Sequence, residues 1–273
     1  MDANPGGEIR IMMQELDHMK YAFPFLSILA VILLAAGGPA RSGKPDAYGS
    51  WMKRPPDEWP RIAVINQIKY IDRRFPVAGC GFLLEVEGEV LAATAKHVLT
   101  YFKSARMESV DFEGTLESWK MFPKDHPSEV IVAGGLLNRN PSESLKGIPC
   151  GKDWLLFAVR KRSKKIQPLR FRATPLEKGE PVYVIGWRYT DKGCPQIVHP
   201  GKYVRSEKGA VCITVPKLIH NTVPGLSGSP VIDGKGYLIG IMSRGRGRIQ
   251  RASPIAYPQE ILKDRAGKAK ELR

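Results

Sequence analysis

The stretch Gly225-Leu226-Ser227-Gly228-Ser229-Pro230-Val231 places Ser227 in a glycine-rich turn directly before an apolar run. Glycine permits backbone conformations that residues with side chains resist, so the chain can bend sharply here and leave the Ser227 hydroxyl exposed. The same bend can turn the N–H groups of Gly225 and Ser227 into one small space, where they would bind an oxyanion. A serine hydroxyl is a weak nucleophile by itself, so a base and an orienting acid are required elsewhere.

Two upstream segments supply these groups. Residues 94–99 (Thr-Ala-Lys-His-Val-Leu) end a β-type run at His97, and residues 152–157 (Lys-Asp-Trp-Leu-Leu-Phe) begin another at Asp153. His97 would take the serine proton, and Asp153 would fix the tautomer of the imidazole. Asp125 is the alternative acid, although its neighbours are those of a polar loop.

The order of these residues separates two classes of hydrolase. In an α/β-hydrolase the acid and the histidine follow the serine, whereas here both precede it, and the chain lacks parallel βαβ periodicity. A glycine-rich loop without a catalytic role is the other interpretation of the serine stretch. The Pro-Val continuation and the upstream histidine and acid together favour the nucleophile.

The three segments resemble the His, Asp and Ser motifs of the chymotrypsin/trypsin-like serine peptidases, in that family's order. Residues 240–245 (Gly-Ile-Met-Ser-Arg-Gly) resemble its substrate-binding strand, and the match covers roughly residues 60–262. The resemblance implies an all-β fold of two Greek-key β-barrels. It also implies a serine endopeptidase that acts on a protein or peptide through an acyl-enzyme.

The same resemblance outlines a specificity pocket. Its floor would lie near Asn221 and Thr222, and its wall would be formed by Ser243, Arg244 and Gly245. No acid occupies the floor, which argues against a preference for Lys or Arg. The polar floor residues also argue against a simple hydrophobic slot.

The pattern of short β-type runs independently indicates an all-β barrel or sandwich. We expect a peptidase domain over residues 61–262, with an N-barrel at about 61–160 and a C-barrel at about 173–255. A joint of seven basic residues and no acid (160–172) lies between them. A closing helix is expected over 255–262, followed by a basic tail (263–273). The expected strands are 62–65, 81–86, 90–95, 130–133, 154–159, 181–185, 198–204, 210–215, 230–232 and 237–242.

Composition sets outer limits on function. The 273 residues are 43% hydrophobic and 25% charged, as in a folded globular protein. The net charge of +15 suits nucleic acid, an anionic membrane or an acidic substrate, but no nucleic-acid motif supports the first. Scattered histidines and cysteines give no metal-ligand spacing, so no metal or cofactor is expected. Four cysteines are present: Cys80, Cys150, Cys194 and Cys212. They could form up to two disulfides in three possible connectivities, and the sequence does not choose among these.

The N-terminal region contains an uncharged apolar run at residues 22–36. It is shorter than the roughly 20 residues of a membrane span and fits the apolar core of a signal peptide. With Met19 as the start, cleavage would follow Gly37. The alternative is an uncleaved membrane anchor, so residues 1–40 predict either a secreted or periplasmic protein or a tethered one. Residues 41–60 are rich in proline, glycine and charge and predict a linker without a core.

A second function, from a different class, is a binding protein on a catalytically silent scaffold of the same fold. The presence of all three catalytic residue types argues against it. Intact residues do not guarantee a formed oxyanion hole, however, so reactivity at Ser227 has to be measured.

Overall fold

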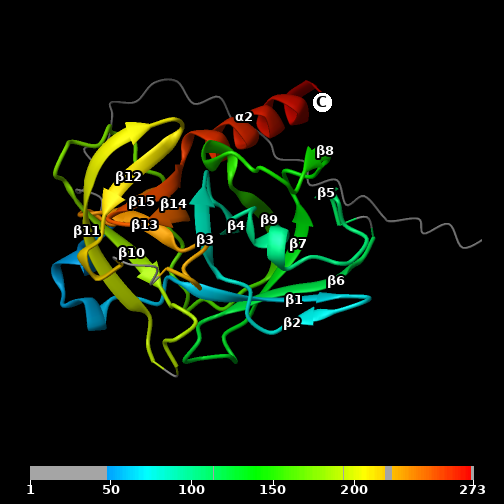
Figure 1. Ribbon diagram of the computed structural model, residues 1–273, viewed down its shortest axis with the longest axis horizontal. Helices are drawn as coiled ribbons and strands as arrows, with labels where there is room; N and C mark the ends of the chain where they lie inside the picture. The colour runs from blue at the N-terminus through cyan, green and yellow to red at the C-terminus, as the bar shows by residue number, and fades with distance from the viewer. Residues whose placement is uncertain (1–47, 113, 193, 219–222, 272–273) are drawn as a thin grey trace, which may run out of the picture. The chain divides into compact units, whose positions relative to one another are not determined.

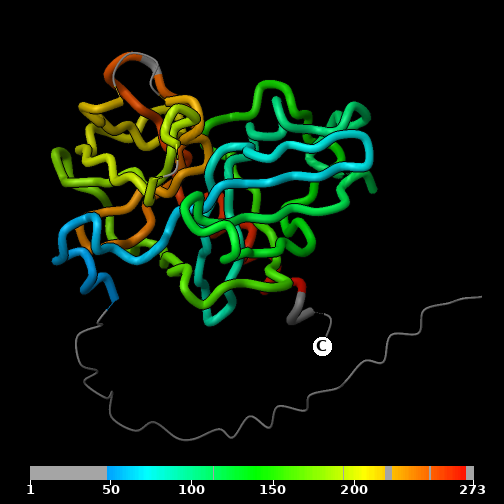
Figure 2. The backbone as a smooth tube through the Cα atoms, turned by 90° about the horizontal axis from the view of Figure 1, so that it is seen from below, coloured from blue at the N-terminus to red at the C-terminus, as the bar shows by residue number. Residues whose placement is uncertain are grey.

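The computed structural model describes residues 48–112, 114–192, 194–218 and 223–271. This part of the chain is mostly β and forms two closed barrels, which lie side by side in Figures 1 and 2. The two-barrel, all-β fold expected from the sequence is confirmed. Within these residues no helix is both long and apolar enough to cross a membrane. The apolar run at 22–36 lies outside the described residues.

The first barrel is a ring of six antiparallel strands. The pairing of β1 (Val64–Tyr70) with β6 (Leu116–Phe122) closes the ring, with Ile65 opposite Phe122. A short strand, β2 (Arg74–Phe75), is added beside β1. In ring order the strands are β1 (Val64–Tyr70), β3 (Cys80–Val86), β4 (Glu89–Thr94), β9 (Leu155–Lys161), β7 (Ile131–Leu136) and β6 (Leu116–Phe122).

The second barrel is also closed and antiparallel. A hairpin turn at residues 233–236 joins β13 (Pro230–Asp233) to β14 (Leu238–Arg246), as expected, and Gly236 N–H donates to Asp233 O at 3.1 Å. The Asp233 carboxylate braces the same turn by accepting the N–H groups of Lys235 and Tyr237. In ring order the strands are β10 (Pro181–Gly186), β11 (Ile197–Glu207), β12 (Ala210–Thr214), β15 (Ile249–Pro254), β14 (Leu238–Arg246) and β13 (Pro230–Asp233).

The segment before the first barrel differs from the expected linker. Residues 48–60 form two short 3₁₀-helices (Ser50–Lys53 and Pro56–Glu58) and bury Trp51 and Trp59. The Trp59 ring packs edge-on to Tyr183 of the second barrel at 5.3 Å. Two tryptophans in a polar stretch therefore dock it on the barrel, and the prediction of a coreless linker is wrong from residue 48 onward.

The C-terminal helix is longer than expected. Helix α2 spans Ala256–Glu271 and includes most of the segment predicted as a tail. Tyr257, Ile261 and Leu262 pack on the core, and the residues that follow are mostly good helix formers, so the helix continues after its apolar contacts end. Arg265 pairs with Glu89 at the start of β4.

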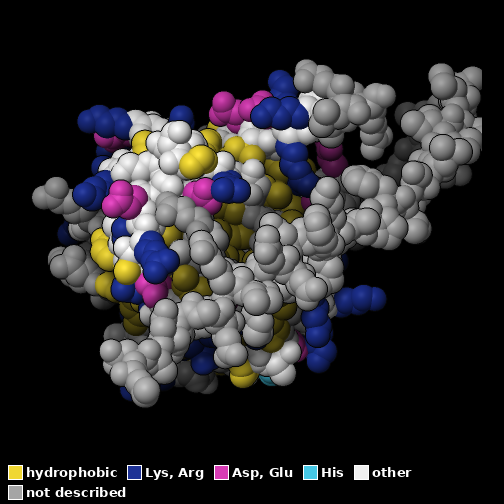
Figure 3. Space-filling view, turned by 90° about the vertical axis from the view of Figure 1, so that its right-hand side faces the viewer, with side chains coloured by type: hydrophobic (Ala, Val, Ile, Leu, Met, Phe, Trp, Pro, Cys, Tyr) yellow, Lys and Arg dark blue, Asp and Glu magenta, His cyan; other side chains and the backbone are white. Residues whose placement is uncertain are grey.

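On the face shown in Figure 3, basic side chains are dispersed with acidic ones among them.

Smaller elements surround the first barrel. The one-turn helix α1 (Val98–Tyr101) follows β4, and β5 (Ser109–Val110) pairs with β8 (Asn140–Ser144).

All four cysteines are free thiols, so neither of the disulfides considered above is present.

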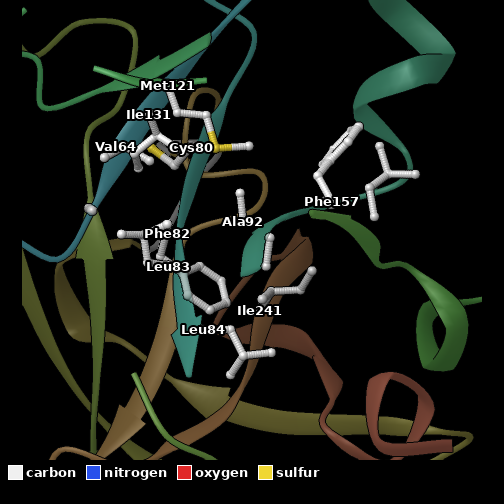
Figure 4. Packing of buried hydrophobic residues seen from close by; sticks show 14 of the residues in the cluster. Val64, Cys80, Phe82, Leu83, Leu84, Ala92, Met121, Ile131, Phe157 and Ile241 are labelled. Carbon is white, nitrogen blue, oxygen red and sulfur yellow. The ribbon is translucent and has the colours of Figure 1, made fainter. Parts of the chain in front are cut away.

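The apolar core of the first barrel continues into the contact with the second. Figure 4 shows Ile241 of β14 beside Leu84 of β3, and both are fully buried. At the same boundary, Cys80 N–H donates to the carbonyl of Ser227 at 2.7 Å. The serine turn of the second barrel is therefore fixed to β3 of the first.

Candidate active site

The structure brings the three sequence-predicted residues into one hydrogen-bonded chain. His97 Nε2 lies 2.7 Å from Ser227 Oγ, and His97 Nδ1 lies 2.6 Å from Asp153 Oδ2. A carboxylate only accepts, so Nδ1 carries the proton and Nε2 is left to accept from the serine hydroxyl. The arrangement can pass a proton from Ser227 to His97.

Each side chain is positioned at the end of a strand or in a turn. His97 lies between β4 and α1, and Asp153 lies between a 3₁₀-turn (Cys150–Lys152) and β9. These two strands pair directly, with Thr94 opposite Leu155. The pairing holds histidine and acid on the first barrel, while Ser227 precedes β13 on the second.

The side chain of Asp153 is almost fully buried, and its carboxylate accepts three hydrogen bonds. Oδ1 accepts the backbone N–H of His97 at 2.7 Å, and Oδ2 accepts both the imidazole and the Ser243 hydroxyl. The alternative acid, Asp125, contacts His126 instead and has no bond to His97. The geometry therefore joins Asp153, and not Asp125, to the histidine.

Two peptide groups beside Ser227 are held in place by hydrogen bonds that their carbonyl oxygens accept. Pro224 O accepts the N–H of Tyr189, and Leu226 O accepts the N–H of Ser229. In a trans peptide the N–H points opposite to the C=O, so the amides of Gly225 and Ser227 turn away from these partners. Neither amide donates to another group among the described residues.

A cavity of about 280 Å³ opens next to Ser227. Ser243, Arg244 and Gly245 line it, as the resemblance implied, together with Val223, Pro224 and Met242. The Arg244 guanidinium donates to the carbonyl of Ile148, so this side chain is tied to the first barrel. The predicted floor residues, Asn221 and Thr222, lie outside the described residues.

A family model described as the trypsin-like peptidase domain matches residues 79–241, which is more than half of the chain. The chain belongs to this family. The trypsin-like peptidase is similar in fold to the active form of the Rv3671c protease from M. tuberculosis. The two are 15% identical with a TM-score of 0.50, over 86% of this chain and 93% of that one. No curated protein matches the chain.

Two contacts in this trypsin-like peptidase were missed by the sequence reasoning. The first is the Ser243 hydroxyl on Asp153, at 2.5 Å, since the sequence suggested only a pocket wall for Ser243. The second is the Cys80 thiol, which lies 3.3 Å from the carbonyl of Gly225. Burial raises the pKa of this thiol, so at neutral pH it keeps its proton and can donate it. Nothing in the sequence around Cys80 indicates a contact with a residue 145 positions away.

A second hollow, larger than the cavity at Ser227, shares no residue with it. It has a volume of about 660 Å³ and includes Arg61, Asp125 and His126 in its wall. Several of its charged groups are already paired: Arg61 binds Glu129 and His126, and Lys165 lies 3.5 Å from Glu129. We therefore place the chemistry at the smaller cavity.

Proposed function

We propose that the chain is a serine endopeptidase in which Ser227 attacks the carbonyl carbon of a peptide bond. The observation that supports this most directly is the unbroken hydrogen-bonded chain from Ser227 through His97 to the buried Asp153. An exposed serine without a base would be a poor nucleophile. Here the base is already within hydrogen-bonding distance of the hydroxyl.

In the acylation step, an oxygen lone pair of Ser227 forms the new C–O bond, and the hydroxyl proton moves to His97 Nε2. The carbonyl π pair moves onto the substrate oxygen, which the amides of Gly225 and Ser227 stabilise. When this intermediate collapses, the C–N bond breaks and the leaving amine takes the proton from His97. Asp153 holds Nδ1–H throughout and stabilises the transient imidazolium.

Deacylation repeats these steps with water. His97 takes a proton from the water molecule, whose oxygen bonds to the acyl carbon, and then returns the proton to Ser227 Oγ as the ester bond breaks. The products are a carboxylic acid and the regenerated serine. Every proton that moves in the scheme passes through His97.

A fluorophosphonate probe tests the proposal, because it phosphonylates a serine only where that serine is activated. We expect one adduct, mapped by mass spectrometry to Ser227 and absent from Ser227→Ala and His97→Ala. Ser229→Ala, in the same turn, is the matched control and should keep the label. Loss of kcat in the Ser227 and His97 variants should reach up to ~10⁶. A folded wild-type protein that binds peptides but takes up no label would instead support the silent binding scaffold.

A further inference from the structure

The side chain of Lys96, the residue directly before His97, is completely buried. A lysine is almost never fully buried unless its ammonium group is paired. Here Nζ donates to Glu143 Oε1 at 2.5 Å and to the hydroxyl of Tyr257 at 3.3 Å, and it lies 5.0 Å from the centre of the Tyr257 ring. The proposed mechanism uses none of these three side chains.

The two partners of Lys96 come from elements outside the ring of the first barrel. Glu143 belongs to β8, 47 positions after the lysine, and Tyr257 belongs to the first turn of α2, 161 positions after it. Residues of both elements, Asn140 and Tyr257 among them, line one hollow, so β8 and α2 are neighbours. One ammonium group therefore joins the turn between β4 and α1 to two elements that are distant in the sequence.

Stability is a weak explanation for this buried ion pair. Removing two charges from water costs free energy, and apolar residues of similar volume in place of a buried pair often leave stability unchanged or raise it. What the pair adds is direction, because Nζ has to reach both the Glu143 carboxylate and the Tyr257 hydroxyl. An apolar side chain at position 96 would fill the space without fixing the course of the backbone.

The backbone that Lys96 fixes is the one that carries the catalytic base. The N–H of Lys96 donates to the carbonyl of Asp153 at 3.3 Å, and the N–H of His97 donates to Asp153 Oδ1 at 2.7 Å. The Lys96 side chain adds a third attachment, to β8 and α2. The imidazole has to stay within hydrogen-bonding distance of both Asp153 and Ser227, and a misplacement of about 1 Å can cost 10²-fold in rate.

We propose that Lys96 is a positioning residue for the peptidase reaction. Through its ion pair with Glu143 and its hydrogen bond to Tyr257, it holds the backbone of His97 where the imidazole can bridge Asp153 and Ser227. This inference rests on the proposed peptidase function and adds β8 and α2 to the elements that support it.

The double variant Lys96→Met/Glu143→Met tests the proposal on the full-length protein. It replaces the ion pair by apolar side chains of similar length, so stability in urea unfolding should equal or exceed that of the wild type. Peptide hydrolysis should nevertheless lose about tenfold or more in kcat, because the imidazole is no longer held in place. KM should be unchanged, since neither residue lines the cavity at Ser227. The rate of fluorophosphonate labelling should fall with kcat, because labelling needs the same base.

Two further variants complete the comparison. Lys96→Met alone leaves the Glu143 carboxylate without its partner, so it should be less stable than the double variant but lose as much kcat. The double variant preserves the test if this single variant does not fold. Lys69→Met/Glu117→Met, which removes an exposed ion pair from the same barrel, is the matched control and should change neither stability nor kcat.

Wild-type kcat in the stable Lys96→Met/Glu143→Met variant would overturn the inference, because the ion pair would then contribute packing alone. A raised KM with unchanged kcat would also overturn it, since the imidazole acts on the chemical step. In both cases labelling of Ser227 would still support the peptidase. A wild-type protein that takes up no label and cleaves no peptide would remove the proposed function, and this inference with it.

Discussion

At the scale of single residues, Asp153 holds His97 at two points. One carboxylate oxygen binds the histidine backbone and the other binds its ring, so both the position and the rotation of the imidazole are fixed by one side chain. Ser243 occupies a further lone pair of the second oxygen. Because the carboxylate is buried, few other partners compete for these bonds.

Replacing Asp153 by Asn should lower kcat/KM by about 10⁴, since the amide no longer enforces the tautomer that leaves Nε2 free to accept. Steady-state hydrolysis of one peptide by both proteins measures this. Asp125→Asn is the control and should retain activity, because Asp125 pairs with His126 and, among the described residues, makes no bond to His97. Full activity in Asp153→Asn, with loss in Asp125→Asn, would refute the assignment of the acid.

Gly225→Ala should lower kcat by about 10²–10³, which is the cost of losing an oxyanion donor. Gly225 has a φ of 106°, and an added Cβ would lie 2.5 Å from the backbone nitrogen of Tyr189. The Tyr189 backbone would have to move, and its hydrogen bond that orients the Pro224–Gly225 peptide would break. Stopped-flow measurement of the acylation burst detects the loss.

Gly234→Ala provides the comparison for Gly225→Ala. Gly234 lies in the β13–β14 turn, and an added Cβ would meet no atom within 4 Å. We expect nearly wild-type kinetics from it. Equal kinetics in the two variants would show that the Pro224–Gly225 peptide does not contribute to catalysis.

At the scale of elements, β11 buries a histidine that makes the stability of the second barrel sensitive to acid. Burial, and then the nearby Arg188, lower the pKa of His199 below its ordinary value of about 6.5. The unfolded chain therefore binds a proton more readily than the folded one. The contribution of neutral His199 to the free energy of unfolding is complete above pH ~6.5 and decreases as the pH falls from there toward the lowered pKa of His199. His199→Leu should flatten this dependence, as urea unfolding at a series of pH values would measure. Parallel curves for the two proteins would rule out the contribution.

The segment that joins the barrels is anchored by Arg172. Its guanidinium pairs with Glu180 and, at 2.8 Å, with Asp233, whose side chain is only 2% exposed. Arg172→Met would leave the buried Asp233 carboxylate without an ion-pair partner, which should lower the free energy of unfolding by about 3–5 kcal/mol. Arg162→Met, in the exposed part of the same segment, should change it by less than about 0.5 kcal/mol. Chemical denaturation compares them, and a similar small change in both would show that the ion cluster is not stabilising.

Most of the strands that the sequence predicted contain runs of apolar or β-branched residues. Strand β6 (Leu116–Phe122) was missed because glutamate and lysine break its apolar pattern, although it buries Trp119 and Met121. Strand β15 was missed because arginine and proline interrupt its apolar pattern. It is recognised as a strand only from its pairing with β12 and β14, which the local sequence does not show. At the site, the motifs identified His97, Asp153 and Ser227. Contacts such as Ser243 on Asp153 depend on how β14 packs against a turn 90 positions earlier, which local sequence does not encode.

At the scale of the whole molecule, the N-terminal region predicts export. The segment from Met19 to Gly37 should direct translocation, with the mature chain beginning at Gly38, because residues 22–36 have the length of a signal-peptide core. N-terminal sequencing of the exported protein checks the cleavage position. A full-length chain recovered in the membrane fraction would establish the anchor, and a full-length chain in the soluble fraction would exclude both.

The hydrogen-bonded chain at the site crosses from one barrel to the other: His97 and Asp153 belong to the first, and Ser227 belongs to the second. Neither half alone contains a nucleophile together with its base. The residues just after β9, 162–165, are mostly exposed, so a break there would separate the two halves without cutting a strand. Peptide hydrolysis by such a divided chain would report the reunion of two inert fragments, which is the behaviour required of a split-protein sensor.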